Sequence, residues 1–171
     1  LRRRVAIPSI RGEAEDGAPF GKGSRQALDE VLAIASELGF QTKNIDNKIG
    51  YAQYGEDRPD GAYYGIFGHV DVMPLGEGWI SPALDLTVRD GRLYGRGTLD
   101  NKGPILSNLY ALYVLKEKGV TFDRPVRIVF GTNEETGFGC VKHYLTKEIP
   151  QTFGWTPDLS LIHLSEPQRL G

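Results

Sequence analysis

The sequence has one cysteine, no long apolar run and no excess of charge of either sign. Its single cysteine, Cys140, cannot form a disulfide within the chain, which favours a reducing compartment, so we expect a cytoplasmic protein. No apolar segment approaches the ~20 residues that span a membrane, and we expect no membrane partner. Because 20 Lys and Arg residues face 22 Asp and Glu residues, no basic excess indicates nucleic-acid binding.

The start of the chain also lacks recognisable signals. Residues 1–13 carry charges but no apolar stretch of the ~7–15 residues that a signal peptide needs. The sequence has no initiator methionine, so we expect it to begin within a longer protein. A length of 171 residues suits one domain with a sizeable core.

The spacing of apolar residues predicts alternating helices and strands. Helices are predicted for residues 24–38, with Ser24 as a candidate cap, for 102–118 and for 141–147. Strands are predicted for residues 40–45, 49–54, 63–67 and 125–132, and a hairpin for 84–94. This alternation of helices with buried strands predicts an α/β fold, a three-layer sandwich with a mostly parallel central sheet.

Side chains that could bind a metal lie just after predicted strands or just before a predicted helix. His69 follows a predicted strand, Asp100 lies just ahead of a predicted helix, and Glu134-Glu135 follows the next buried strand. Loops at the carboxyl ends of parallel strands meet at one edge of a sheet, so we expect these groups to lie together. Adjacent carboxylates repel one another unless a cation intervenes, and imidazole with carboxylates is a ligand set that zinc accepts. Asp71 lies two residues beyond His69, on the same side of an extended chain, and is a candidate to orient the imidazole.

This ligand set suggests hydrolysis of an amide. One glutamate of the pair would bind metal while its neighbour takes a proton from activated water, and several carboxylates can hold two metals roughly 3.5–4 Å apart. Other interpretations of the residues stay open, because Glu134-Glu135 also suits a solvated helix start and Gly95-Arg96-Gly97 also suits a turn. The phosphate-loop pattern GxxxxGK[ST] is absent from the sequence.

Three motifs in this order resemble a known family: GHVDVMPLGEGW, LYGRGTLDNKGP and GTNEETG. They resemble the di-zinc metallopeptidases of the aminoacylase, succinyl-diaminopimelate desuccinylase and carnosinase superfamily. With IPSIRGEA near the start and GWTPD near the end, they are most similar to bacterial dipeptidases of the PepV type. The resemblance covers about residues 7–158 and implies a zinc exopeptidase-like fold that acts on a small peptide.

The resemblance also implies a role for each site residue. It implies two zinc ions, with cobalt or manganese as alternatives, and a cis peptide bond between Asp100 and Asn101. The implied roles are as follows: His69 and Asp158 bind the first zinc, Asp71 orients His69, Asp100 bridges both ions, Glu134 is the general base and Glu135 binds the second zinc.

The sequence departs from this family in two respects. Family members are more than twice as long, with an inserted lid domain and a last zinc-ligand histidine near the C-terminus, and neither is found here. We therefore expect residues 1–158 to be a partial catalytic domain. Residues 159–171 do not resemble the family; they resemble a translated sequencing-library adapter, which suggests a gene model that ran off a contig end. His163 in this tail is a candidate replacement ligand.

These departures leave three functions to compare. The first is a dipeptidase, the second is an N-acyl amino acid deacylase or desuccinylase with the same metal centre, and the third is an inactive fragment. A sheet built to receive later strands would expose an apolar edge, so we also expect poor solubility. The sequence does not indicate the oligomeric state.

Overall fold

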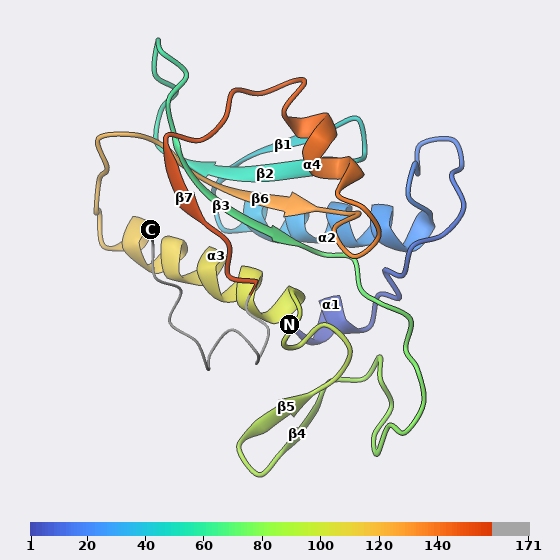
Figure 1. The fold of residues 1–171 in the computed structure, drawn as a ribbon. Helices are drawn as coiled ribbons and strands as arrows, with labels where there is room; N and C mark the ends of the chain where they lie inside the picture. Colours follow the sequence, from blue (N-terminus) through green and yellow to red (C-terminus); the bar gives the residue numbers. More distant parts are fainter. Residues whose placement is uncertain (159–171) are drawn as a thin grey trace, which may run out of the picture.

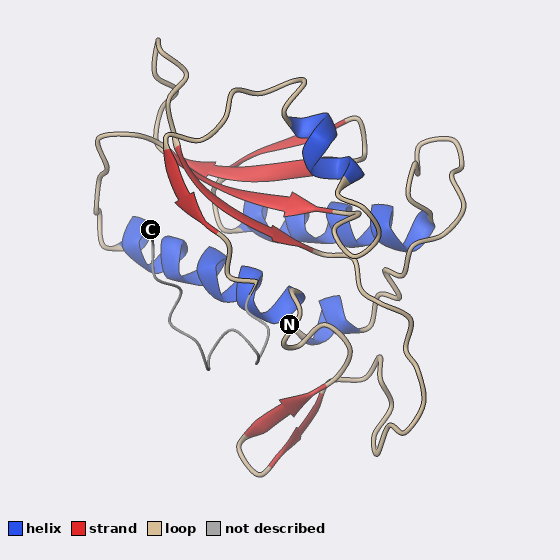
Figure 2. Ribbon diagram, in the orientation of Figure 1, coloured by secondary structure: helices blue, strands red, loops and turns tan. Residues whose placement is uncertain are grey.

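A five-stranded sheet lies between helices on its two faces in the computed structural model, which describes residues 1–158 (Figures 1 and 2). Strand β2 pairs antiparallel with both of its neighbours, while β3 pairs parallel with β6 and β7. The other four strands therefore share one direction, which confirms the mostly parallel sheet. In spatial order the strands are β1 (Gln41–Ile45), β2 (Ile49–Tyr54), β6 (Val126–Gly131), β3 (Tyr64–His69) and β7 (Phe153–Trp155).

Alternate residues of the strands fill two apolar clusters, one on each face of the sheet. Ile128 and Phe130 of β6 pack with residues of α2 (Lys22–Glu37) and α3 (Lys102–Glu117). Val129, which points to the opposite face, packs with Cys140 and Tyr144 of α4 (Gly139–Tyr144). The expected three layers are therefore present, and no second domain lies within the described residues.

Two smaller elements lie away from the sheet. Helix α1 (Arg2–Val5) begins the chain, and the strands β4 (Thr87–Arg89) and β5 (Arg92–Tyr94) form an antiparallel hairpin that extends away from the domain (Figure 1). Within the described residues, no helix combines the length and apolar character needed to cross a membrane.

The element boundaries differ from the predictions in a few places. Helix α2 begins at Lys22 with Gly21 as its N-cap, so the predicted cap at Ser24 is wrong: Ser24 is buried within the helix. Helix α4 begins at Gly139, two residues earlier than predicted. The short elements α1 and β7 were not predicted, because four and three residues carry too little periodicity.

Candidate metal centre

His69 is the last residue of β3, and its side chain is 1% exposed. Its ring nitrogens face different partners. Nδ1 lies 3.0 Å from the backbone oxygen of Asp71, while Nε2 faces a group of carboxylates. An imidazole that donates from Nδ1 to a carbonyl presents the lone pair of Nε2 outward, as a metal ligand requires.

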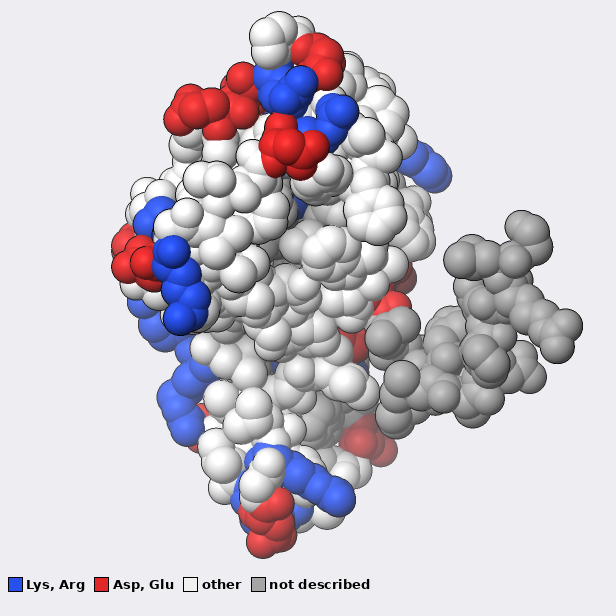
Figure 3. Space-filling model, turned by 90° about the vertical axis from the view of Figure 1, so that its left-hand side faces the viewer, with Lys and Arg blue, Asp and Glu red and all other residues white. Residues whose placement is uncertain are grey.

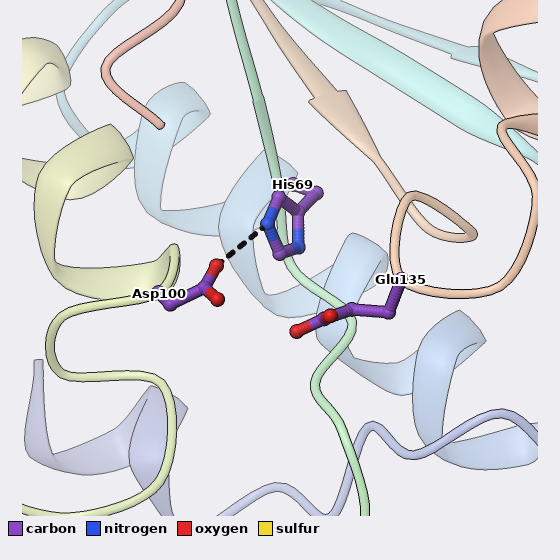
Figure 4. Close-up of side chains that lie close together, drawn as sticks. All are labelled: His69, Asp100 and Glu135. Atoms are coloured by element: carbon purple, nitrogen blue, oxygen red, sulfur yellow. Dashed lines mark hydrogen bonds and ion pairs between the residues drawn. The ribbon is translucent and has the colours of Figure 1, made fainter. Parts of the chain in front are cut away.

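Three carboxylates lie near Nε2 of His69. The nearest is Asp100, whose Oδ1 lies 3.0 Å away, and Glu134 and Asp158 each place an oxygen at 3.6 Å. Figure 4 shows His69, Asp100 and Glu135 pointing toward a common space from three separate segments. Ligand atoms lie within 4.8 Å of one another in two groups, His69 with Asp100 and Glu135, and His69 with Glu134 and Asp158.

Asp71 connects the histidine to the glutamate pair. Its carboxylate is buried, and its Oδ1 lies 3.4 Å from Nδ1 of His69. The same carboxylate accepts hydrogen bonds from the backbone N–H groups of Glu134 and Glu135, at 3.2 and 3.1 Å. Asp71 therefore fixes the end of β3 and the loop after β6 together. The sequence did not reveal the two backbone contacts, since the residue spacing contains no signal for them.

Asn101 links three segments of the site. Its side-chain oxygen accepts the backbone N–H of His69 at 3.4 Å, and its amide donates to the carbonyl of Pro157 at 3.4 Å, next to Asp158. The approach is so close that a Cβ on Gly68 would lie 2.5 Å from the Asn101 oxygen, which explains the glycine before the histidine. The Asp100–Asn101 bond is cis, as the resemblance implies.

The N-terminal segment contacts the chain on either side of Asp71 and the start of α3. The Ser9 hydroxyl donates to the carbonyl of Val70 at 2.6 Å, and Ser9 also accepts the N–H of Val72. Lys102, at the start of α3, donates to the carbonyls of Arg4 and Ile7. The IPSI motif is thus a backbone support for the chain on both sides of Asp71.

The carboxylates change the acidity of the whole site. Burial disfavours the imidazolium, but the hydrogen bonds to Asp100 and Asp71 outweigh it and raise the pKa of His69 to about 10. Burial, followed by repulsion from Asp100, raises the pKa of Glu135 to about 6. Burial also raises the pKa of Glu134 above its ordinary value. The site therefore favours a positive charge at its centre, which a proton on His69 or a bound cation supplies.

This donor set fits a divalent metal. One imidazole nitrogen and several carboxylate oxygens converge, and the second imidazole nitrogen has an acceptor that fixes the ring. All six residues predicted from the sequence lie together here. One difference from the implied assignment is that Glu134 lies as close to His69 as Asp158 does. His163 and the predicted segment 159–171 lie outside the described residues.

Known proteins are similar to this chain in sequence. Residues 65–171 match the family model described as Peptidase family M20/M25/M40. "Putative dipeptidase YtjP" of Bacillus subtilis is 39% identical over 156 residues, which are 90% of this chain and 33% of that protein. "Putative dipeptidase SH1171" of Staphylococcus haemolyticus is 36% identical over 92% of this chain and 34% of its own length. The chain thus spans about a third of the curated relatives it matches.

Solved structures share the fold. Human carnosine dipeptidase 1 superposes with a TM-score of 0.78 at 23% identity, covering 95% of this chain and 38% of that chain. An M20 family metallo-carboxypeptidase from Sulfolobus solfataricus gives a TM-score of 0.68 at 23% identity, over 85% of this chain and 32% of that chain. The family match over residues 65–171 shows that the chain belongs to peptidase family M20/M25/M40.

Proposed function

We propose that this chain carries the metal centre of a cytoplasmic zinc dipeptidase. The observation that carries the proposal is the convergence of Asp100, Glu134 and Asp158 on Nε2 of a buried histidine. Several carboxylates beside one imidazole are a ligand set that can hold two divalent metals. The family and the dipeptidases named among its relatives support the same reaction class.

Each residue then has a chemical role. His69 and Asp158 would hold one zinc, Glu135 would hold the second, and Asp100 would bridge them. The metals, when bound, would polarise the scissile carbonyl and lower the pKa of a water molecule toward ~7. Cobalt or manganese would suit the same oxygen-rich set.

Glu134 would move the proton. Its carboxylate takes a proton from the attacking water as the water oxygen bonds to the peptide carbon. When the carbon–nitrogen bond breaks, the protonated Glu134 returns that proton to the leaving amine. Burial raises the pKa of Glu134 above its ordinary value, which favours its acceptance of a proton. Asp71 would keep the imidazole and the loop that carries Glu134 and Glu135 in fixed positions during this transfer.

A second candidate function is metal binding without turnover. The chain covers about a third of its dipeptidase relatives, and in this structure Asp100 and Glu135 are the carboxylates available for a second metal. A deacylase or desuccinylase would use the same centre, so the test includes an N-acyl amino acid and N-succinyl-diaminopimelate beside a set of dipeptides.

The test measures zinc content and hydrolysis for the full chain and two variants. Glu134→Gln should keep its zinc and lose roughly 10²–10⁴-fold of the hydrolysis rate, because it removes only the proton acceptor. His69→Ala should lose zinc and hydrolysis together. Matched controls are Glu117→Gln, an exposed glutamate on α3, and His143→Ala, a histidine that pairs with Asp46.

The outcomes separate the candidates. Hydrolysis of dipeptides that depends on both site residues supports the dipeptidase. Zinc retained without hydrolysis of any substrate supports the metal-binding fragment. A chain that retains no zinc would contradict both, and faster hydrolysis of an acylated amino acid would favour the deacylase.

A further inference from the structure

Helix α4 and its two capping residues carry apolar side chains beyond those that are fully buried against the sheet. Cys140 and Tyr144 are fully buried against the sheet. Phe138, Val141 and Leu145 form a second apolar stripe: Phe138 is the N-cap residue of α4 and Leu145 its C-cap residue, and these two remain 49% and 52% exposed. Val141 packs against the core cluster on this face of the sheet, whereas the exposed parts of Phe138 and Leu145 lie outside it.

The second stripe borders a cavity of about 380 Å³ that opens onto the metal centre. Its other wall contains His69, Glu134 and Asp158, so the apolar side chains lie directly beside the proposed reacting groups. Phe67 of β3 contributes further apolar surface to the lining. Gln151 and Thr156 add uncharged polar groups.

The charged residues in this lining limit which substrate side chains the cavity can bind. The described residues around the cavity include no lysine and no arginine, and the acidic ones are the candidate metal groups Glu134 and Asp158. Away from a bound metal, this lining would therefore give an acidic side chain or a succinyl group no counter-charge. An apolar side chain would instead cover the exposed faces of Phe138 and Leu145, which gains free energy from the removal of apolar surface from water.

We propose that this cavity, the α4 pocket, binds an apolar amino-acid side chain of the substrate, with Phe138, Val141 and Leu145 as specificity-determining residues. This inference rests on the proposed function. It deepens that function by predicting a preference for dipeptides with a large aliphatic residue over those with glycine or aspartate.

The test measures peptide binding rather than turnover. Saturation-transfer difference NMR would give dissociation constants of Gly-Gly, Leu-Gly, Gly-Leu, Asp-Gly and Gly-Asp for the zinc-loaded and the metal-free full chain, with the same spectra reporting peptide integrity. At least one leucine peptide should bind about tenfold or more tighter than Gly-Gly, while its aspartate counterpart should not. The order of residues that shows the preference identifies which side chain enters the pocket.

Two variants connect the preference to the pocket. Leu145→Ser should reduce the leucine preference to less than about threefold without changing zinc content, because Leu145 contributes apolar surface to the cavity and is not among the candidate metal groups. Leu115→Ser is the matched control, since Leu115 is a partly exposed leucine of α3 outside this cavity.

Equal affinities for leucine and glycine peptides would overturn the inference, as would tighter binding of aspartate peptides or an unchanged preference in Leu145→Ser. Failure of the proposed function would appear differently, as lost zinc or absent turnover. The two proposals can therefore fail separately.

Discussion

Asp71 is the residue on which the geometry of the metal centre most depends. It contacts His69 through both its carbonyl and its carboxylate, and it accepts the backbone N–H groups of Glu134 and Glu135. An orienting partner of a ligand histidine typically contributes 10–100-fold to metal affinity. Here the same side chain also fixes the loop that carries two further site residues.

Replacement of this carboxylate should therefore weaken metal binding more than a loss of charge alone would. Asp71→Asn keeps one oxygen but directs an amide N–H group at a backbone N–H, so we expect zinc affinity to fall by about 10–100-fold. Asp71→Ala should cause a larger loss. Competition with a chromophoric chelator measures both, with the exposed Asp16→Asn as the control for charge. Zinc affinity equal to wild type in Asp71→Asn would contradict this role.

The single cysteine provides a pH-dependent contribution to stability. Burial raises the pKa of the Cys140 thiol above its ordinary value of 9.0. In the unfolded chain this thiol titrates at its ordinary pKa, so above about pH 9 the unfolded state binds fewer protons than the folded state. The free energy of unfolding should therefore fall as pH rises through this range.

Cys140→Ala removes the titrating group and tests the sign of this effect. Urea unfolding of both proteins between about pH 7.5 and about pH 10 should show wild type losing its stability relative to the variant as pH rises. A difference that stays constant across this range would show that the thiol titrates alike in both states. The burial of Cys140 also agrees with a packed side chain and not with a nucleophile.

At the level of elements, the sequence predicted the helices and strands that have a clear apolar periodicity. The boundaries of β2 and the start of α3 agree with the prediction, because their apolar spacing is strong and their neighbours are turn residues. The predicted site residues converge because each follows a strand or precedes a helix at the same edge of the sheet. The second apolar face of α4 was not predicted, since a helix of six residues shows no clear period.

The burial of Arg127 within β6 was also not predicted, because its partners come from segments that are distant in the sequence. The Arg127 guanidinium lies between the rings of Tyr51 and Tyr63, each 4.4 Å from the ring centre. It donates to Glu148, which follows α4, at 2.9 Å, and both side chains are nearly buried, at 8% and 11% exposed. This pair holds the end of the α4 segment against the sheet.

Removal of one partner from this pair should destabilise the fold. Glu148→Gln leaves the buried guanidinium with only the exposed Asp57, 3.5 Å away, as a counter-charge, and we expect the free energy of unfolding in urea to fall by about 3 kcal/mol. Glu117→Gln removes an exposed glutamate that pairs with Lys116 and should change it by less than about 0.5 kcal/mol. Equal effects of the two substitutions would show that burial adds nothing to the Arg127–Glu148 pair.

At the scale of the whole molecule, one side has an extended uncharged surface. Figure 3 views the side of the domain on which β7 and the end of α3 lie, and uncharged residues cover its middle, with charged ones above and below. A groove of about 570 Å³ runs here between α3 and β7. Phe153 and Trp155 of β7 are 65% and 50% exposed beside it, on a strand whose described partner is β3 alone.

An exposed sheet edge with aromatic side chains favours association between chains, because the edge offers unpaired backbone groups next to apolar surface. We expect the purified chain to self-associate, and Phe153→Lys with Trp155→Lys to shift it toward a monodisperse monomer in light scattering and sedimentation. The control Val88→Lys adds a charge at an exposed apolar residue of the β4–β5 hairpin and should leave the association unchanged. A wild-type chain that is a stable monomer would contradict the prediction, and equal effects of both sets of substitutions would assign the association to net charge instead of this edge.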